Sequence, residues 1–516
     1  MPRRHGEILI EPPLATLGAA VVEPPNFTSL VQWPAFAALR GFARSALLAQ
    51  IQAFAERSRI TPPHGAILHQ PWVITGHQLE FYHAGVWAKV LAADTLAHRT
   101  GALAIDVLVD HDRVDELGFD VPVQVGDTWV RQSITWALSP QTPADSLHAP
   151  APEQFSTWQS ALAACPRARS DSLARMLTEL NPPAIGSREY TLWLSSARAR
   201  FERAMGLDVW HVPTSLLCAS ETWVVFVREW MTHAEPWTAS YNRHLAAYRK
   251  RAGIVNPQHP MPNLQRIGDT FELPFWIYRP GEPRQRLFVR REANRLLVPV
   301  DGRDFDVTDD LAPLLATNSA DSYQIRPRAL TLTMYVRLFL ADLFIHGIGG
   351  ALYDQVTDGI MQELWGVVPP YGCVSAAWLL PLESTTGAVA SESQLQHRRH
   401  HLQHNPQLAM DSTVAAAPEL AALLRARQEL IAGLESSLAA DRIAGKSRRA
   451  EMFRSLHETN AALHTATPGI LQRLDDQLAG ARRAAEQGAV TQWREYFFAL
   501  HSLESLHRLI DTVRGM

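Results

Sequence analysis

The sequence predicts an α/β protein with a parallel core sheet, small β and helical insertions, and a C-terminal helical domain. Three observations favour this class. A strand, a helix and a second strand follow one another between residues 72 and 109. Leucines recur at helical spacing through the last quarter of the chain. The 516 residues are also too many for one simple core, so we expect two or three structural parts.

The composition excludes several classes of function. The net charge of −4 provides no basic field for nucleic acid. The three cysteines form no CxxC pair, so neither a disulfide framework nor a cysteine zinc site is expected. No apolar run approaches the roughly 18 to 20 residues of a membrane helix, and no signal-length apolar stretch follows Met1. We therefore expect a cytoplasmic protein that binds neither nucleic acid nor membrane.

The N-terminal half contains the most informative unit. Apolar residues at helical spacing predict a helix over 36–54. Residues 72–75 are apolar and β-branched and end at a glycine, which predicts a buried strand. Helical spacing over 86–96 and a second apolar run over 104–109 complete a βαβ unit, which pairs the two strands in parallel.

The remaining core elements follow from shorter patterns. Paired extended segments around a Gly126-Asp127 turn predict a hairpin, and 139–155 are expected to be a surface connection. The other expected elements are a strand at 208–212, a long helix from about 221, a β insertion over 271–300, a helix over 330–345, a helix ending near 365, and a strand over 374–380.

Three leucine-rich stripes predict a helical hairpin or coiled coil at the C-terminal end of the sequence. The first runs through Leu420 to Leu438 and is interrupted at Arg427, the second begins at Leu471, and the third begins at Tyr496. Charged residues fill the positions between the apolar ones.

The first candidate site is Thr75-Gly76-His77-Gln78, at the end of the first strand. Gly76 lets the backbone approach a ligand, and a helix start directly after it offers free N–H groups to an anion. His77 and Gln78 can donate to a phosphate, a carboxylate or a polar substrate. The alternative is a capped helix start with His77 in solvent.

The second candidate is Asp110-His111-Asp112, directly after the second strand. Ligands of open α/β sheets collect beyond the carboxyl ends of strands. A carboxylate that accepts from a His ring raises its basicity, as a general base for an amine requires. A polar turn is the alternative. Lys89 either faces this edge and neutralises a substrate anion or faces solvent.

Two more segments carry possible chemistry. The glycines of His346-Gly347-Ile348-Gly349-Gly350 permit close backbone approach, or they form a tight helix connection. Upstream, Arg326 and Arg328 can supply fixed positive charge. The four histidines between 397 and 404 have metal-compatible spacing, but the adjacent arginines favour a solvated helix, and no metal is predicted.

The stretch from Val73 to about Phe119 resembles the bacillithiol biosynthesis cysteine-adding enzymes, also called putative cysteine ligases. Their pattern of Thr-Gly-Gln-Gln, a Gly-Pro loop, a helical Lys and Glu-Asp-His-Asp corresponds here to 75–78, to the loop His83-Ala84-Gly85, to Lys89 and to 110–112. Arg326-Pro327 and Gly349-Gly350 match a second cluster. This sequence departs from the pattern at His77, in the altered loop, at Val109, and after Gly350, where Asp354 lies near the missing Pro-Gly-Glu.

The resemblance implies a Rossmann-like core over 70–390, with insertions near 115–160 and 255–310, between an entry segment at 1–69 and a coiled-coil domain at 391–516. It also implies an amide-forming ligase that joins cysteine to glucosaminyl malate and dimerises through the coiled coil. In this interpretation Asp110 and Asp112 hold the amino group and His111 is the base, while His77, Lys89 and Arg326 hold anions. The expected substrates are an amino acid and an amino-sugar conjugate. ATP is a possible cofactor, although no P-loop sequence is present.

Other functions stay open at this point. A divergent relative can join a different amine and amino acid. A nucleotide- or sugar-binding protein can use the same loops without chemistry. A coiled-coil scaffold whose core carries no site is the third alternative.

Overall fold

Short apolar segments of the sequence form a central sheet in the computed structural model, which describes residues 1–23, 36–61, 67–138, 142–181, 189–255, 261–315, 322–382, 391–410, 417–440, 446–466 and 469–516. The strand order is β1-β14-β13-β2-β3-β6. The bounds are β1 Glu7–Glu11, β14 Tyr371–Ala377, β13 Leu343–His346, β2 Trp72–Gln78, β3 Leu103–Val109 and β6 Val209–Pro213. All neighbours pair in parallel except β1, which runs antiparallel to β14. The predicted parallel pairing of the first two strands is confirmed.

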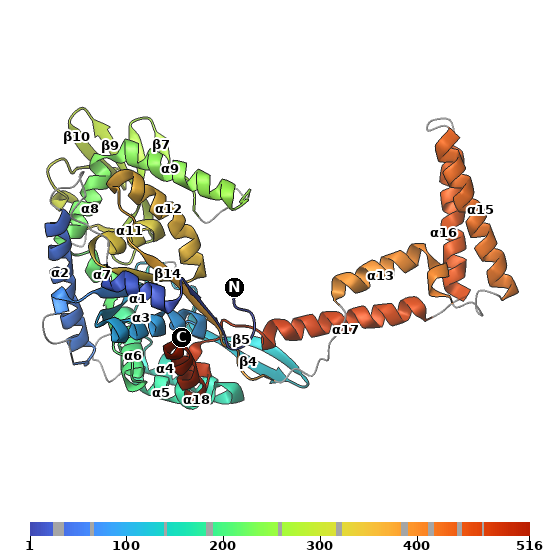
Figure 1. Ribbon diagram of the computed structural model, residues 1–516, viewed down its shortest axis with the longest axis horizontal. Helices are drawn as coiled ribbons and strands as arrows, with labels where there is room; N and C mark the ends of the chain where they lie inside the picture. The colour runs from blue at the N-terminus through green and yellow to red at the C-terminus, as the bar shows by residue number, and fades with distance from the viewer. Residues whose placement is uncertain are drawn as a thin grey trace. The chain divides into compact units, whose positions relative to one another are not determined.

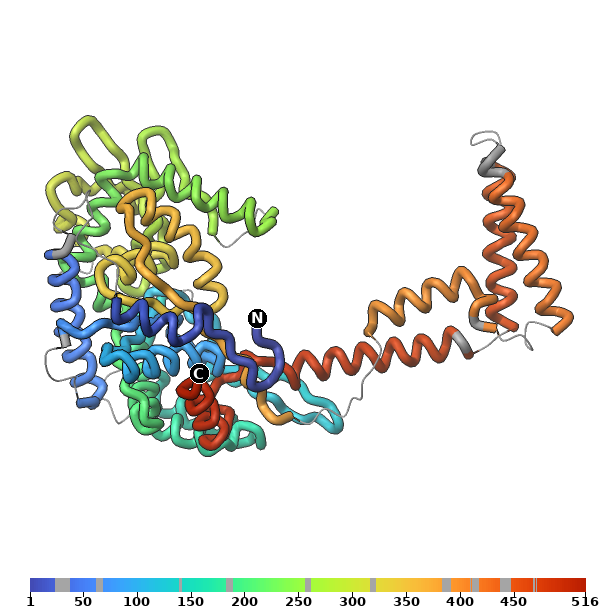
Figure 2. Tube along the Cα trace, in the orientation of Figure 1, coloured from blue at the N-terminus to red at the C-terminus, as the bar shows by residue number. Residues whose placement is uncertain are grey.

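Helices cover both faces of this sheet because both faces of its strands are apolar. Trp72 and Ile74 belong to a core shared with α2 (Phe36–Arg57), α11 (Ala329–Phe339) and α12 (Ile348–Trp365). The alternate residues of β2 face α3 (Ala84–Thr100), which is buried along most of its length. The helices α1 (Leu14–Val22) and α18 (Leu503–Gly515) pack on α3, and Figure 2 shows the dark red C-terminal segment returning to this part of the chain.

A second, antiparallel sheet has the order β11-β10-β9-β8-β12, with β7 beside β8. Its bounds are β7 Arg266–Ile267, β8 Thr270–Tyr278, β9 Gln285–Glu292, β10 Arg295–Val300, β11 Arg303–Asp306 and β12 Gln324–Pro327. It lies near α8 (Glu221–Thr232) and α9 (Ala234–Arg251), as Figure 1 shows. The strands β4 (Leu117–Val125) and β5 (Thr128–Ala137) form the predicted hairpin, and α4 (Pro152–Ala164), α5 (Asp171–Glu179) and α6 (Tyr190–Ala204) follow.

The structure corrects three expectations. The run 330–345 is not one helix, because α11 ends at Phe339 and Leu343–His346 form the central strand β13. Apolar residues dominate both pieces, and such a run carries no periodicity that separates a buried helix from a buried strand. The third C-terminal helix begins at Leu503 rather than at Tyr496. The N-terminal segment contributes β1, which the sequence pattern does not indicate.

The chain divides into two units by its internal contacts. Unit 1 contains residues 1–123, 131–380 and 494–516, and unit 2 contains residues 124–130 and 381–493. The elements named so far belong to unit 1, apart from the tip of the β4–β5 hairpin. No helix in the described ranges is long and apolar enough to cross a membrane.

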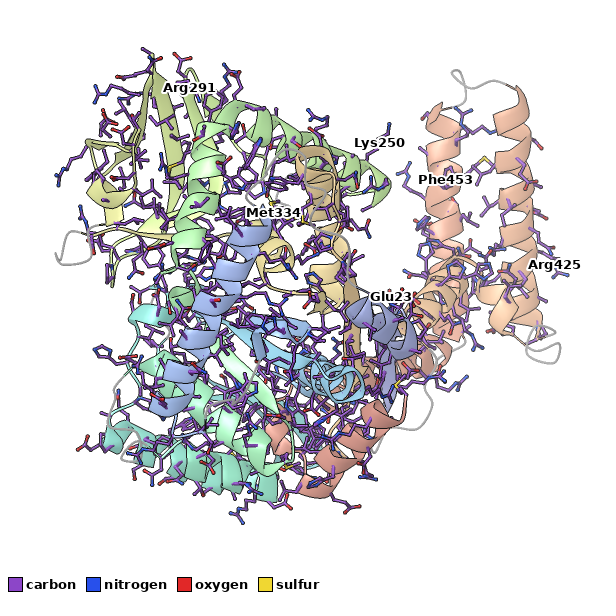
Figure 3. All side chains as sticks on the ribbon, turned by 60° about the vertical axis from the view of Figure 1, so that its left-hand side comes forward. Glu23, Lys250, Arg291, Met334, Arg425 and Phe453 are labelled. Carbon is purple, nitrogen blue, oxygen red and sulfur yellow. The ribbon has the colours of Figure 1, made fainter. Side chains whose placement is uncertain are left out.

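Unit 2 consists mainly of helices: α13 Glu392–His404, α15 Pro418–Ala440, α16 Lys446–Ala466 and α17 Ile470–Thr491. The pair α15 and α16 lies side by side, with Arg425 and Phe453 labelled on them in Figure 3, and leucines of α13 and α17 form a small core. Arg427 is buried, where it donates to Asn460 Oδ1 at 2.9 Å and to the His404 carbonyl at 2.9 Å. Where Arg427 interrupts the first leucine stripe, its buried guanidinium therefore joins helices through hydrogen bonds.

Candidate functional site

The strand order reverses between β2 and β13, and in open α/β sheets the carboxyl ends of two such strands mark the position of the ligand-binding crevice. The chain passes from β2 to β3 and β6 in one direction and later adds β13 and β14 on the other side of β2. Helix connections therefore diverge at the carboxyl ends of β2 and β13, which is the position where open α/β sheets bind ligands. This topology brings Gly76-His77-Gln78 beside His346-Gly347, two segments that are far apart in the sequence.

The start of α12 lies at this crevice and has an open first turn. Gly347 is the N-cap and provides no side-chain acceptor, while Gly349 and Gly350 are exposed. A Cβ on Gly349 would meet no atom within 4 Å. The free N–H groups and the positive end of an 18-residue helix suit an anion.

Lys89 adds a positive charge next to this helix start. Its Nζ donates to the Gly76 carbonyl at 2.6 Å, and its Cδ lies 3.7 Å from the position of a Cβ on Gly347. The residue is only 6% exposed. Burial lowers the pKa of Lys89 to about 8, although Asp106 and Cys373 oppose that effect. The ammonium can donate three hydrogen bonds and has one fixed acceptor here, so an anion can take the others.

His346 is held by the carboxylate of Asp354, with 2.8 Å between His346 Nε2 and Asp354 Oδ2. The same carboxylate accepts from Arg337 and from Thr333 Oγ1. The charge of Arg337 and the contacts with His346 and Thr333 hold the pKa of Asp354 well below its usual range despite its burial. Asp354 is therefore engaged by three side chains of the protein, and its role in ligand binding stays a prediction. Gly350 is needed here because a Cβ would approach His346 Nδ1 to 2.6 Å.

The predicted position of His77 at a helix start is wrong. β2 continues to Gln78 and α3 begins only at Ala84, so His77 lies in the strand rather than at a helix start. Its Nε2 lies 2.7 Å from Asp106 Oδ2, and burial lowers the pKa of His77 although Asp106 opposes this. A helix start needs an N-cap after the strand, and that residue is His83, whose Nδ1 accepts from Gly85 N at 3.0 Å.

A buried polar network lies behind His77. Besides His77, Asp106 approaches His211, which lies 3.1 Å from Glu202, and Arg198 lies 3.4 Å from the His77 ring. Burial alone would raise the pKa of Asp106, but His77 and the other cations bring it to about 2. The sequence signal for this network is a single Asp inside the apolar run 104–109. Nearby, Thr75 Oγ1 donates to the Ile345 carbonyl at 2.9 Å and joins β2 to β13 instead of facing a ligand. Gly76 packs against β3, where a Cβ would lie 3.0 Å from the Val107 carbonyl.

At the carboxyl end of β3, Asp110 is fully buried. Its carboxylate accepts from the backbone N–H of Ser215 at 2.9 Å and from the Ser215 hydroxyl. Burial and the nearby carboxylate of Asp145 raise the pKa of Asp110 to about 7. A carboxyl group that changes charge near neutral pH can take part in proton transfer.

The predicted pairing of His111 with a neighbouring Asp is wrong. Asp112 instead pairs with Arg284 at 2.6 Å and accepts from Gln78 Nε2 at 2.8 Å. The Nδ1 atom of His111 has no hydrogen-bond partner in the described structure. Burial lowers the pKa of His111 to about 3, although Asp112 opposes this, so the ring is neutral at physiological pH. The contact between Gln78 and Asp112 brings the two predicted motifs together, as expected.

A cavity of about 250 Å³ opens next to Asp110. Its polar walls include Asp145, Ser215, Gln324 and Arg326. The sequence predicts a surface connection for the segment that contains Asp145. No pattern in this proline-rich stretch distinguishes a carboxylate that folds back onto the sheet from one that faces solvent. Arg326, in strand β12, lies with its Nε 3.7 Å from Asp145 Oδ2.

Comparison of the chain with known protein families and with curated proteins finds no match. The resemblance to cysteine-adding enzymes therefore stays a prediction.

Proposed function

We propose that this protein is a carbon–nitrogen ligase with a Rossmann-like core, which activates a carboxylate and joins it to an amine. One observation carries the proposal: an anion-binding helix start and an acidic cavity lie at the ends of strands in one sheet. β13 and β3 are separated by β2 alone, so the two sites are about 10 Å apart at ordinary strand spacing. Two substrates, one with a phosphorylated or adenylylated carboxyl held at the helix start and one with an amine held at the cavity, can therefore meet between the two sites.

The anion end is formed by the first turn of α12 and the ammonium of Lys89. The partly free ammonium supports binding of a phosphate group, and the exposed Gly349 leaves room for it. ATP is the proposed source of activation. A phosphate or AMP that leaves from the acyl carbon would be stabilised by the same N–H groups and charge.

The amine end is the cavity next to Asp110. Asp145, and Asp110 when it is ionised, are acceptors for an ammonium group, and Arg326 can pair with a carboxylate on the same substrate. Asp112 is engaged by Arg284 and orients Gln78 rather than holding the amine. His111 is too weak a base for the reaction at neutral pH, because its neutral ring has a pKa of about 3.

The proposal includes a cytoplasmic location and a homodimer formed through a coiled coil of unit 2. Cysteine and glucosaminyl malate are the proposed first substrates, and a different amine and amino acid are the alternative pair.

The test is product formation followed by mass spectrometry. The purified protein is incubated with cysteine and glucosaminyl malate, with and without ATP, and the condensed amide is sought. Lys89→Met serves as the comparison variant, and Lys250→Met, at the exposed end of α9, serves as the control. Product that requires ATP and Lys89 supports the proposal. Absence of product with these and with other amino acid and amine pairs, from a folded protein that ATP stabilises, would instead indicate a nucleotide-binding protein.

A further inference from the structure

We infer that Asp110 and Asp145 act as a carboxylate pair that holds one proton, and that this pair accepts the proton that the amine substrate gives up. The second clause rests on the proposed function, whereas the first concerns the protein alone. Asp145 was not a predicted site residue, and the pair replaces His111 in the role of base.

The surroundings of Asp145 stabilise its charged form. Tyr278 donates its hydroxyl to Oδ2 at 2.7 Å, and Ser146 donates to Oδ1 at 3.1 Å. The guanidinium Nε of Arg326 lies 3.7 Å from Oδ2 and has no hydrogen-bond partner within the described structure. Three groups from three different elements thus favour an anion at this position.

Asp110 has weaker support for a negative charge. Among the described residues, Ser215 alone donates to its carboxylate, and Asp110 has no exposed surface. The backbone N–H of Asp145 donates to the Asp110 carbonyl at 2.6 Å, which fixes the two residues next to each other. A second negative charge in a buried site is unfavourable, so the proton of the pair resides on Asp110. The raised pKa of Asp110 agrees with this assignment.

The other ionisable groups around the pair do not change this balance. The Cys218 thiol stays protonated because burial raises its pKa well above the usual range of a thiol. His111 is neutral, and the charge of Arg284 is matched by Asp112. At the rim of the cavity, Arg57 and Glu189 form an ion pair of 2.7 Å with each other. Among these groups, Arg326 is therefore the one cation near the pair whose charge is not already matched by a carboxylate outside the pair.

The proton balance of the reaction follows. The substrate enters as an ammonium ion, and when both carboxylates are ionised the pair takes one proton from it, which resides on Asp110. The neutral nitrogen then attacks the activated acyl carbon with its lone pair. The C–N bond forms, the bond from carbon to the leaving phosphate or AMP oxygen breaks, and that oxygen keeps the electron pair. The second proton lost by nitrogen goes to solvent, and the pair releases its own proton before the next cycle.

The experiment measures the proton directly by infrared spectroscopy. The carbonyl band of a protonated carboxyl group is followed against pH in the full-length protein, and the Asp110 band is identified by its loss in Asp110→Asn. In the wild type we expect this band to titrate near pH 7. Asp145→Asn, which removes the charge and keeps the shape, should move the midpoint down by at least one pH unit. Asp145→Glu should retain the high midpoint.

The control is Asp309→Asn, because Asp309 is exposed and lies outside the cavity. It should leave the spectrum of the pair unchanged. If Asp110→Asn does not fold, the band that moves in Asp145→Asn but not in Asp145→Glu identifies Asp110. An Asp110 midpoint near its ordinary value, or one that Asp145→Asn does not change, would overturn the inference.

Amide formation provides the second measurement. If the protein forms an amide, Asp145→Asn should move the acid limb of the rate profile to lower pH by the same interval as the infrared midpoint. A rate profile that stays in place while the infrared midpoint moves would contradict the role of the pair in the reaction. A pair that titrates as described in a protein that forms no amide would contradict the proposed function and leave the one-proton pair standing.

Discussion

Replacing Lys89 by Met tests whether the crevice between β2 and β13 is kept for a ligand at the expense of stability. Lys89 is 6% exposed, and burial lowers its pKa from 10.5 to about 8. A shift of this size corresponds to about 3 kcal/mol of unfavourable free energy when the group is charged in the folded protein. Methionine has a similar length and no charge, so Lys89→Met removes this cost.

The hydrogen bond to Gly76 opposes the gain. A hydrogen bond from a charged donor contributes about 1.5–3 kcal/mol. At pH 7 the variant should therefore be as stable as the wild type or more stable by up to about 2 kcal/mol. Unit 1 has roughly 400 residues, for which about 1 kcal/mol changes Tm by a little more than 1 °C. The expected rise in Tm is thus at most about 2 °C.

The pH dependence separates the two contributions. Below pH 8 both the folded and the unfolded wild type carry the proton, so the cost of burial is fully present. Between pH 8 and pH 10.5 the unfolded chain binds more protons than the folded protein, so the stability of the wild type rises with pH relative to the variant. The difference in Tm between Lys89→Met and wild type should therefore fall by about 3–4 °C over this interval.

Differential scanning calorimetry from pH 7 to pH 10 measures this difference, with Lys250→Met as the exposed control. A difference in Tm that stays constant over this range would refute the assignment of Lys89 as a buried ammonium. Binding of ATP should fall at least tenfold in Lys89→Met at pH 7. A variant that gains stability and keeps its affinity for ATP would refute the functional interpretation of the crevice.

Two further predictions concern residues that support the site. Asp342 accepts from the Trp72 N–H and pairs with Arg40 and Arg44 at 2.8 and 3.0 Å. Asp342→Asn should therefore lower the free energy of unfolding by about 3–5 kcal/mol, which calorimetry detects as a fall in Tm of about 5 °C. Gly350→Ala places a Cβ 2.6 Å from His346 Nδ1 and should cost about 1–3 kcal/mol, whereas Gly349→Ala meets no atom and should be neutral or stabilising. Equal Tm values for the two glycine variants would contradict the close packing of His346 on α12.

The sequence predicts those parts of the fold in which the pattern of apolar residues is compatible with only one type of secondary structure. β2, α3 and β3 follow from short β-branched runs on either side of a helical segment that ends at Gly101. β13 does not, since its four residues continue the apolar run of α11 and only the neighbouring strands give it an extended conformation. β1 is equally hidden, because its place in the sheet depends on pairing with β14 more than 360 residues later.

The candidate site divides in the same way. Position at the ends of neighbouring strands correctly indicates that Gln78 and Asp112 meet. The partners of each charge are set by tertiary contacts: Arg284 reaches Asp112 from the second sheet, and Asp145 returns from a loop. Their adjacency in the sequence suggests that His111 interacts with Asp110 or Asp112, but the side chains of neighbouring residues at a strand end point in different directions.

The last segment of unit 1 has a consequence for synthesis on the ribosome. Phe498 stacks on Trp87 with ring centroids 4.9 Å apart, and α18 covers α3, yet residues 381–493 of unit 2 are translated before either of them. At 5–20 residues per second, this interval lasts on the order of ten seconds. During that time the apolar surface of α3 that α18 later covers is exposed, and a nascent-chain chaperone would recognise such a surface. Completion of this face of unit 1 therefore follows the synthesis of unit 2.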